Sequence, residues 1–349
     1  MTVPSHLVDP VPMKEAREIC RDLFAPNAGL YWIDAMGSAV VGWTAFVFAL
    51  TVPMWSPAYL ALTLVATLTL YRAILFVHEL THLAKGALPG FNVAWDLVVG
   101  IPLALPSFMY HGTHLDHHRR TIYGTIHDPE YVPYGVPPRT KIIRALIEPF
   151  IAPVALFARF LVLAPLSVLL GSRFRAMIVS SASTLAINLA YRRDPPKDSL
   201  RIRWIWTETL ASLVAIALVA SVAFDRLPIQ VLIQWYIVSA CIAHVNNLRT
   251  LAAHRYRNAG AEMDVQGQLA DSVNTPGAWW TELWAPVGLR WHGLHHFLPD
   301  VPYHNLGRAH RRLISALPES TVYRRTLSPS LWASLADVWR SAGGAPNRG

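Results

Sequence analysis

Histidine spacing is the feature of this chain that best predicts chemistry. Eight of the 15 histidines fall into three short motifs: His78-Glu79-x-x-His82, His114-x-x-His117-His118 and His292-x-x-His295-His296. Spacings of three and four residues place imidazoles on one face of a helix. Because neutral imidazole is the commonest metal ligand in proteins, the motifs predict a metal centre.

The number of imidazoles favours two metal ions. Eight ligands exceed what one ion accepts, whereas two ions could share them at about four each. A single catalytic zinc takes three protein ligands and would leave most of these histidines unused. Nitrogen-rich coordination with open positions suits redox iron that handles dioxygen. We therefore expect a dinuclear iron site.

The first motif also allows another class of enzyme. His78-Glu79-x-x-His82 matches the pattern of zinc metalloproteases, in which Glu79 would be the general base. That alternative leaves six of the motif histidines without a role. A metal transporter is favoured less, because few polar groups occur within the apolar segments.

Composition predicts an integral membrane protein. The 349-residue chain is 53% hydrophobic and only 15% charged, with a mean hydropathy of +0.31. The first 35 residues carry several charges before any long apolar run, which is unlike a cleaved signal peptide. The two cysteines cannot form a disulfide framework. The basic residues flank apolar segments, so we expect no nucleic-acid partner.

Two helical hairpins are expected to cross the membrane, at residues 36–56 with 58–77 and at residues 204–224 with 228–245. Segments 91–110 and 146–170 are interrupted by prolines and by Arg159, which indicates interfacial or re-entrant helices. Five tryptophans beside these boundaries are expected to be interfacial anchors: Trp32, Trp55, Trp95, Trp204 and Trp206.

All three motifs can reach one site only if each stretch of chain between them crosses the membrane an even number of times. Four spans satisfy that condition. Of the 30 lysine and arginine residues, only Arg226 then lies in an outer loop and only Arg72 within a span. We therefore expect a multi-pass protein with a cytoplasmic N-terminal segment at 1–35, a catalytic domain at 36–315 and a cytoplasmic tail at 316–349. The expected fold is all-α, with interfacial helices and a cytoplasmic helical cap that holds the dimetal site.

These motifs resemble the histidine boxes of the membrane fatty acid desaturase and hydroxylase superfamily. The resemblance covers about residues 36–315 and includes the tail that follows the third box, Phe297-Leu298-Pro299-Asp300-Val301-Pro302-Tyr303-His304-Asn305-Leu306. It implies a non-haem diiron enzyme that uses dioxygen and supplied electrons to attack an unactivated C–H bond. The metal ligands would be His78, His82, His114, His117, His118, His292, His295 and His296.

The resemblance also implies roles for residues near the boxes. His254 is the candidate for a ninth ligand, and Glu79 is expected to orient an imidazole instead of binding metal. Where stearoyl-CoA desaturases have an asparagine that helps hold a metal-bound water, this chain has Thr250, and Asn246 or Asn247 could substitute. The remaining candidates are weaker: Asp116, Asp128 and Glu130 as hydrogen-bond partners of box imidazoles, and His111, His127, His244, His304 and His310 as structural histidines.

The expected activity is desaturation of a fatty acyl lipid. The alternative within the same chemistry is hydroxylation of a lipid, alkane or carotenoid-like substrate, because both reactions begin with hydrogen abstraction. The sequence contains no cysteine cluster for an iron–sulfur centre and no haem-binding module, so a separate electron donor is expected. We expect an acidic, ferredoxin-like donor that docks near Arg308, Arg311 and Arg312, with contact of these arginines to lipid headgroups as the open alternative.

Overall fold

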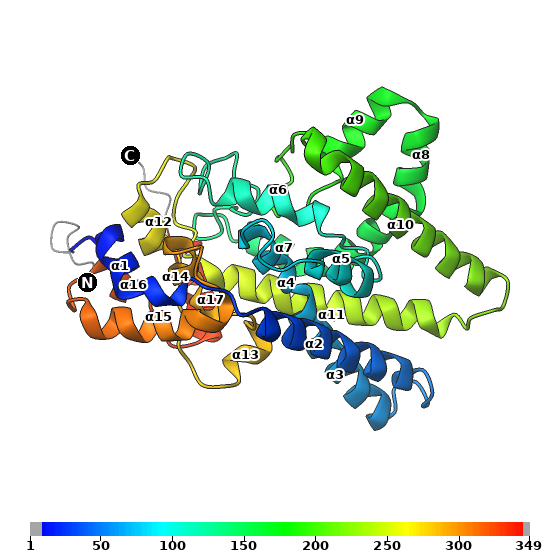
Figure 1. Cartoon of the computed structure of the whole chain (residues 1–349), viewed down its shortest axis with the longest axis horizontal. Helices are drawn as coiled ribbons and strands as arrows, with labels where there is room; N and C mark the ends of the chain where they lie inside the picture. The colour runs from blue at the N-terminus through cyan, green and yellow to red at the C-terminus, as the bar shows by residue number, and fades with distance from the viewer. Residues whose placement is uncertain (1–8, 345–349) are drawn as a thin grey trace.

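The computed structural model describes residues 9–344, and its regular elements there are all helical. The first hairpin consists of α2 (Ala28–Ala49) and α3 (Pro57–Ile74), which pack along each other (Figure 1). Side-chain caps fix the N-terminal ends of both helices: Asn27 accepts a hydrogen bond from the Leu30 N–H, and Ser56 accepts one from the Tyr59 N–H. The cap at Asn27 explains why α2 begins eight residues before the expected span.

The second hairpin consists of α10 (Asp198–Ala223) and α11 (Gln230–Ala253). Helix α11 continues eight residues past the expected end of its span, and His254 is its C-terminal cap. It also packs against α3 and against α7 (Thr140–Ala158). Both helix pairs predicted from hydropathy are therefore present, although α10 packs against the helix at 159–169 instead of along α11. Helix α11 connects the apolar bundle to the polar end of the molecule.

A fifth helix meets the length and hydropathy of a membrane span, in the segment where we expected an interfacial or re-entrant helix. It runs over Thr140–Leu169, as α7, the π-helical η4 (Arg159–Leu163) and α8 (Ala164–Leu169). Arg159 does not interrupt it, because its guanidinium is buried in an ion pair with Glu208 of α10 and donates to the Ala182 carbonyl at 2.8 Å.

Five apolar helices do not establish five crossings. Three of them, Thr140–Leu169, Leu200–Ala223 and Gln230–Ala253, lie between the second and third histidine boxes. Since those boxes meet at one site, as shown below, an even number of complete crossings must separate them. The four-span topology therefore stays a prediction, with Thr140–Leu169 as the helix whose path decides it.

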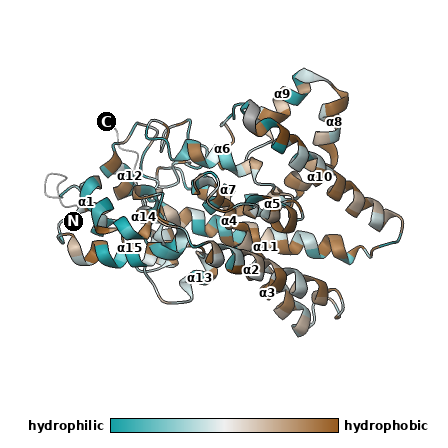
Figure 2. Ribbon diagram, in the orientation of Figure 1, coloured by the Kyte–Doolittle hydropathy of each residue, from teal (hydrophilic) through white to brown (hydrophobic). Residues whose placement is uncertain are grey.

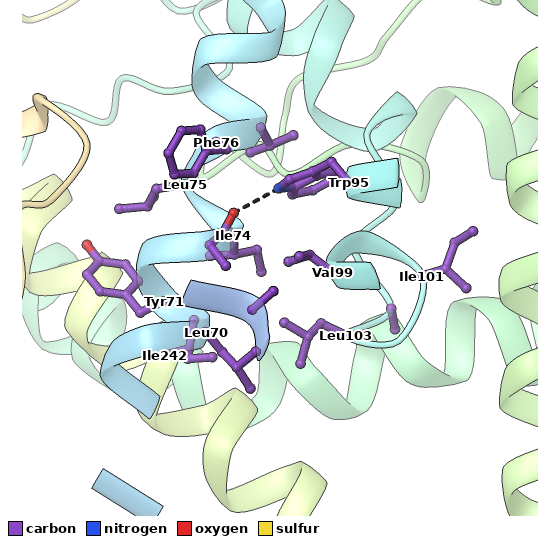
Figure 3. Close-up of a cluster of buried hydrophobic side chains, with 14 of the residues drawn as sticks. Leu70, Tyr71, Ile74, Leu75, Phe76, Trp95, Val99, Ile101, Leu103 and Ile242 are labelled. Carbon is purple, nitrogen blue, oxygen red and sulfur yellow. Dashed lines mark hydrogen bonds between the residues drawn. The ribbon is translucent and has the colours of Figure 1, made fainter. Parts of the chain in front are cut away.

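Between the first two boxes the chain forms α5 (Phe91–Trp95) and the π-helical η3 (Asp96–Gly100). Trp95 is fully buried among Phe76, Val99 and other apolar side chains, and its Nε1 donates to the Ala73 carbonyl at 2.8 Å (Figure 3). Trp204 is also buried and stacks on Phe108. The expectation that these two tryptophans anchor the protein at the interface was wrong, because each packs inside the bundle; Trp55 and Trp206 are exposed.

The polar end of the molecule is a cap of helices from the first third and the last third of the chain. They are α1 (Met13–Ile19), η2 (Arg21–Leu23), α4 (Phe76–His82), α6 (Phe108–His117), α12 (Val265–Asp271), α13 (Thr281–Trp284), η5 (Leu289–Trp291), α14 (His292–Phe297), α15 (Tyr303–Ala316), α16 (Val322–Arg325) and α17 (Leu331–Ser341). The short helix α9 (Ser172–Ser181) follows α8. Hydrophobic colour dominates α2, α3 and α10, whereas α1 and α15 are mostly hydrophilic (Figure 2).

The N-terminal helix is packed into this cap. Val11, Ala16, Cys20 and Leu23 share a buried apolar cluster with residues of α14 and α15. Arg312 of α15 forms an ion pair with Asp22 across the same contact. The division of the chain at residues 35 and 315 stays a prediction, although both flanking segments contact the part between them.

Candidate metal centre

Four separate segments carry the nine histidines proposed as metal ligands. His78 and His82 lie on α4, and His254 caps α11. The second box lies on α6 and its C-terminal cap, and the third box lies on α14. Helix α4 directly follows α3, and His254 ends α11, so the bundle positions the imidazoles of these two segments.

The nine imidazoles form two groups in which the candidate ligand atoms lie within 4.8 Å of one another. The first group contains His78, His82, His114, His118 and His295, and the second contains His117, His254, His292 and His296. The groups adjoin, because the ring of His118 stacks on the ring of His296 with centroids 4.4 Å apart. Each group thus has four or five nitrogen donors, as two neighbouring ions require.

Helix geometry explains how the boxes divide. Successive residues on an α-helix point about 100° apart, so the adjacent His117 and His118 enter different groups. The first and last histidines of each H-x-x-H-H motif are four residues apart and share a group. In the third box, His292 and His296 belong to the second group and His295 to the first.

The distances between ring nitrogens fit metal coordination. Nε2 of His118 lies 3.0 Å from Nε2 of His114 and 3.1 Å from Nε2 of His295. A ring nitrogen either carries one hydrogen or has one lone pair, so hydrogen bonds do not account for both contacts. Two nitrogens bound to one ion at about 2.1 Å and about 90° apart lie about 3 Å from each other.

The second group repeats this pattern. Nε2 of His292 lies 2.8 Å from Nε2 of His254 and 3.0 Å from Nε2 of His296. In the first group, the buried Nε2 atoms of His78 and His82 have no hydrogen-bond partner among the described residues. Buried polar atoms without partners are costly, and an ion in each group would satisfy them.

Hydrogen bonds on the outer side of three rings leave Nε2 free to bind metal. Nδ1 of His117 lies 2.8 Å from Oδ1 of Asp128, and Nδ1 of His114 lies 2.9 Å from Oε1 of Glu130. Nδ1 of His254 lies 2.8 Å from the Tyr123 hydroxyl oxygen. A carboxylate only accepts hydrogen bonds, so Nδ1 of His117 and His114 donates and their Nε2 atoms keep lone pairs.

Burial keeps most of these imidazoles neutral. It lowers the pKa of His114, His118, His254, His292, His295 and His296 well below the usual value. His117 differs: burial is the largest cause and lowers its pKa, but the carboxylates of Asp128, Glu130 and Asp271 together raise it above the usual value. Burial also raises the pKa of Glu130 to about 7 and that of Asp271 to about 6. Neutral imidazole is the form that binds metal.

Glu79 is buried beside the first box. Its Oε2 accepts hydrogen bonds from the Tyr31 hydroxyl and, at 3.0 Å, from the Tyr303 N–H, while its Oε1 lies 3.5 Å from Nδ1 of His78. Glu79 is therefore tied to α2 and to the segment after the third box. Its role in positioning His78 stays a prediction.

Several candidates from the sequence lie outside both groups. His244 contacts Phe150, and His304 accepts the Asn27 N–H. His111 and His127 are also outside the groups, and His310 stacks on Trp291. Asp116 bonds to Tyr191 instead of an imidazole, and Asn247 donates to the Ala145 carbonyl.

Sequence reasoning missed Tyr110, Tyr123 and Asp271. The Tyr110 hydroxyl lies 2.9 Å from Nδ1 of His114. Tyr123 bonds to both His254 and Asp271. Tyr110 lies four residues before His114, so helical spacing could have indicated it, whereas no local pattern connects Tyr123 or Asp271 to His254.

Comparisons with known proteins agree with this geometry. Residues 53–328 match the family model described as fatty acid desaturase. A ceramide hydroxylase of Caulobacter vibrioides (strain NA1000 / CB15N) is 37% identical over 328 residues, which cover 94% of this chain and 93% of that protein. The chain therefore belongs to the fatty acid desaturase family.

Family membership confirms that the protein is a membrane oxidoreductase of the desaturase and hydroxylase superfamily. It also removes the basis for the zinc metalloprotease alternative, which used only the first box. Within the family, the match to a hydroxylase favours the alternative reaction over the desaturation that we expected first.

Proposed function

We propose that this protein is a diiron, dioxygen-dependent membrane hydroxylase of a ceramide-like amide lipid. The main support for this proposal is the match to a ceramide hydroxylase over nearly the full length of both chains. The two adjoining groups of nitrogen donors support it. The overall reaction converts a C–H bond, dioxygen, two electrons and two protons into C–OH and water.

In this proposal, the nine histidines hold two iron ions, which supply dioxygen activation and one-electron chemistry for breaking an unactivated C–H bond. Asp128, Glu130 and Tyr123 fix the rings of His117, His114 and His254 through Nδ1. Tyr31 and Tyr303 hold Glu79, whose other oxygen faces Nδ1 of His78 in the first box.

Arg249 supports a substrate with a polar group near the attacked carbon. It lies on α11, and its guanidinium bonds to Asn246 and Thr250 at 3.1 and 3.0 Å. Within the described residues it has no carboxylate within ion-pair distance. Burial and a neighbouring imidazole are the largest causes that lower the pKa of His254 and of His292. The positive charge of Arg249 is the next largest.

A guanidinium with spare N–H donors suits an amide carbonyl or a hydroxyl group better than a hydrocarbon chain. Arg249 would therefore bind the polar part of the lipid while a nearby carbon reaches the centre. A mid-chain methylene, as in the desaturation that we expected first, would place hydrocarbon against this charge. The distribution of basic residues supports a cytoplasmic position for the site.

The test is expression in a bacterial host that makes no ceramide, supplied with a ceramide and a working electron donor. Mass spectrometry should find a product heavier by one oxygen atom, and isotopically labelled dioxygen should label it. His295→Ala should remove the product, whereas His244→Ala, on a histidine outside both groups, should keep it. A product lighter by two hydrogens would restore the desaturase; no product from any acyl lipid would refute the lipid substrate.

A further inference from the structure

A cavity of about 210 Å³ in the cap is lined by His254, one member of the second histidine group. Its lining includes the buried His254 and the exposed Pro329 and Arg340. One wall is α17, which contributes Ser334 and Arg340 and packs against α11 (Figure 1). The cavity thus places a proposed metal ligand, His254, beside a hollow that opens to the exterior.

The rim of this cavity is basic. Arg255 and Arg257 both pair with Asp337, at 3.3 and 2.8 Å. Arg340 lines the cavity, and the exposed Arg325 adjoins it, because its carbonyl accepts a hydrogen bond from Arg255. Arg255 and Arg257 thus share one carboxylate, and Arg340 lines the same cavity, so basic side chains outnumber acidic ones at this rim.

Two tryptophans of α17 add exposed aromatic area beside this charge. Trp332 is 72% exposed and Trp339 is 40% exposed. Arg139 lies over the Trp339 ring, 4.7 Å from its centroid. Tryptophan and arginine are enriched in protein interfaces. We call Arg255, Arg257, Arg325, Arg340, Trp332 and Trp339 together the α17 surface.

The arginines that the sequence suggested for donor docking are less suitable. Arg312 is paired with Asp22. Arg308 and Arg311 are exposed on the outer side of α15, whose inner side packs on α14 through a cluster that includes Leu306 and Leu313. That apolar layer separates them from the histidine groups, whereas His254 lines the cavity of the α17 surface.

The geometry points to the α17 surface as the docking site of an acidic one-electron carrier protein, with His254 as the entry point for electrons. This inference rests on the proposed function, which needs two electrons for each lipid hydroxylated. The carrier is oxidised by one electron at each visit, so two visits complete a turnover. Charge complementarity favours an acidic partner and accelerates its encounter, and the aromatic side chains bury apolar area at the contact.

The test measures binding of an acidic [2Fe–2S] ferredoxin to the full-length protein in phosphatidylcholine nanodiscs. Arg257→Glu and Arg340→Glu should each weaken the affinity by about tenfold or more at low ionic strength, and salt should weaken wild-type binding. Arg173→Glu, an exposed reversal on α9, is the matched control and should bind as wild type does. Cross-linking should join ferredoxin carboxylates to residues near α17 only in the variants that bind.

Unchanged affinity in both α17 variants would overturn the inference. Loss of affinity in Arg308→Glu alone would place the donor on α15 and overturn it as well. If the charge reversals weaken ferredoxin binding only when the nanodiscs contain anionic lipid, the arginines bind lipid headgroups, and the inference is overturned. Hydroxylation by wild type is measured separately, so a protein that binds ferredoxin without oxidising ceramide refutes the proposed function and not the docking site.

Discussion

Nδ1 of His117 and Oδ1 of Asp128 lie 2.8 Å apart, and the two side chains are 1% and 0% exposed. Asp128 is itself fixed by the backbone N–H groups of Gly124 and Glu130, at 2.7 and 2.8 Å. A rigid, buried carboxylate therefore sets the ring orientation and the tautomer of His117. Such outer hydrogen bonds orient metal-binding imidazoles and raise their basicity.

Asp128→Asn should weaken iron binding while the fold is kept. The amide preserves the shape but removes the charge that strengthens the bond to His117. We expect iron affinity to fall by about 10- to 100-fold, measured by competition with a chelator. Asp194→Asn, at an exposed position outside the site, should leave affinity unchanged. Equal affinity in the two variants would contradict the role of Asp128.

Iron binding should weaken as pH falls below about 7, because of Glu130. Burial raises its pKa to about 7, so the carboxylate that accepts the Nδ1–H of His114 is lost as pH falls through that value. The folded-state pKa is raised, so the iron-free protein prefers protonated Glu130. Binding of iron must then release that proton, and acid competes with the metal.

The measurement is iron affinity at about pH 6 and about pH 8, in wild type and in Glu130→Gln. Wild type should bind more weakly at the lower pH. The variant has no carboxyl group to titrate, so its affinity should be low at both values with a smaller difference between them. A wild-type affinity independent of pH would exclude this coupling.

The H-x-x-H-H motifs show how far sequence reasoning reaches. Spacing predicted that each box presents its imidazoles together, and all eight box histidines do lie in the two groups. It did not predict which histidines of different boxes share a group, because that depends on where α6 lies relative to α14. The addition of His254 came from family resemblance, and its position depends on the length of α11.

The partners of the imidazoles were harder to predict because they come from distant parts of the chain. Tyr123 is 131 residues from His254, and only the packed cap brings them together. Hydropathy located both hairpins, yet it could not show that Glu208 pairs with Arg159 and lets Thr140–Leu169 form a long helix. Burial of Trp95 and Trp204 likewise depends on neighbours that no local pattern reveals.

Single-cysteine labelling should resolve the topology. In a variant without Cys20 and Cys241, a reagent that does not cross membranes should label position 56 or 226 from outside. It should spare positions 120, 200 and 320, because the converging boxes require an even number of crossings between them. Arg173→Cys reports on the fifth apolar helix and should also be spared. External labelling at position 173 or 200 would overturn the four-span arrangement.

Arg249→Gln should impair use of the lipid without removing iron. Loss of the guanidinium removes the donors proposed to bind the polar part of the substrate, so KM for ceramide should rise by about tenfold or more, in line with a lost charged hydrogen bond. Arg249→Lys keeps the charge and should recover part of the loss. Iron content should match wild type in both. An unchanged KM in Arg249→Gln would exclude contact with the substrate.

The division into two groups predicts that single substitutions remove one ion at a time. His254→Ala takes one of four donors from the second group, and His82→Ala takes one of five from the first. Iron per chain should fall from about two toward about one in each variant, more completely in His254→Ala because fewer donors remain. His244→Ala, ten residues earlier on the same helix as His254, should retain both ions. Turnover should be lost in both site variants, because the reaction needs the complete pair. Full iron occupancy in His254→Ala, measured in correctly inserted protein, would remove His254 from the ligand set.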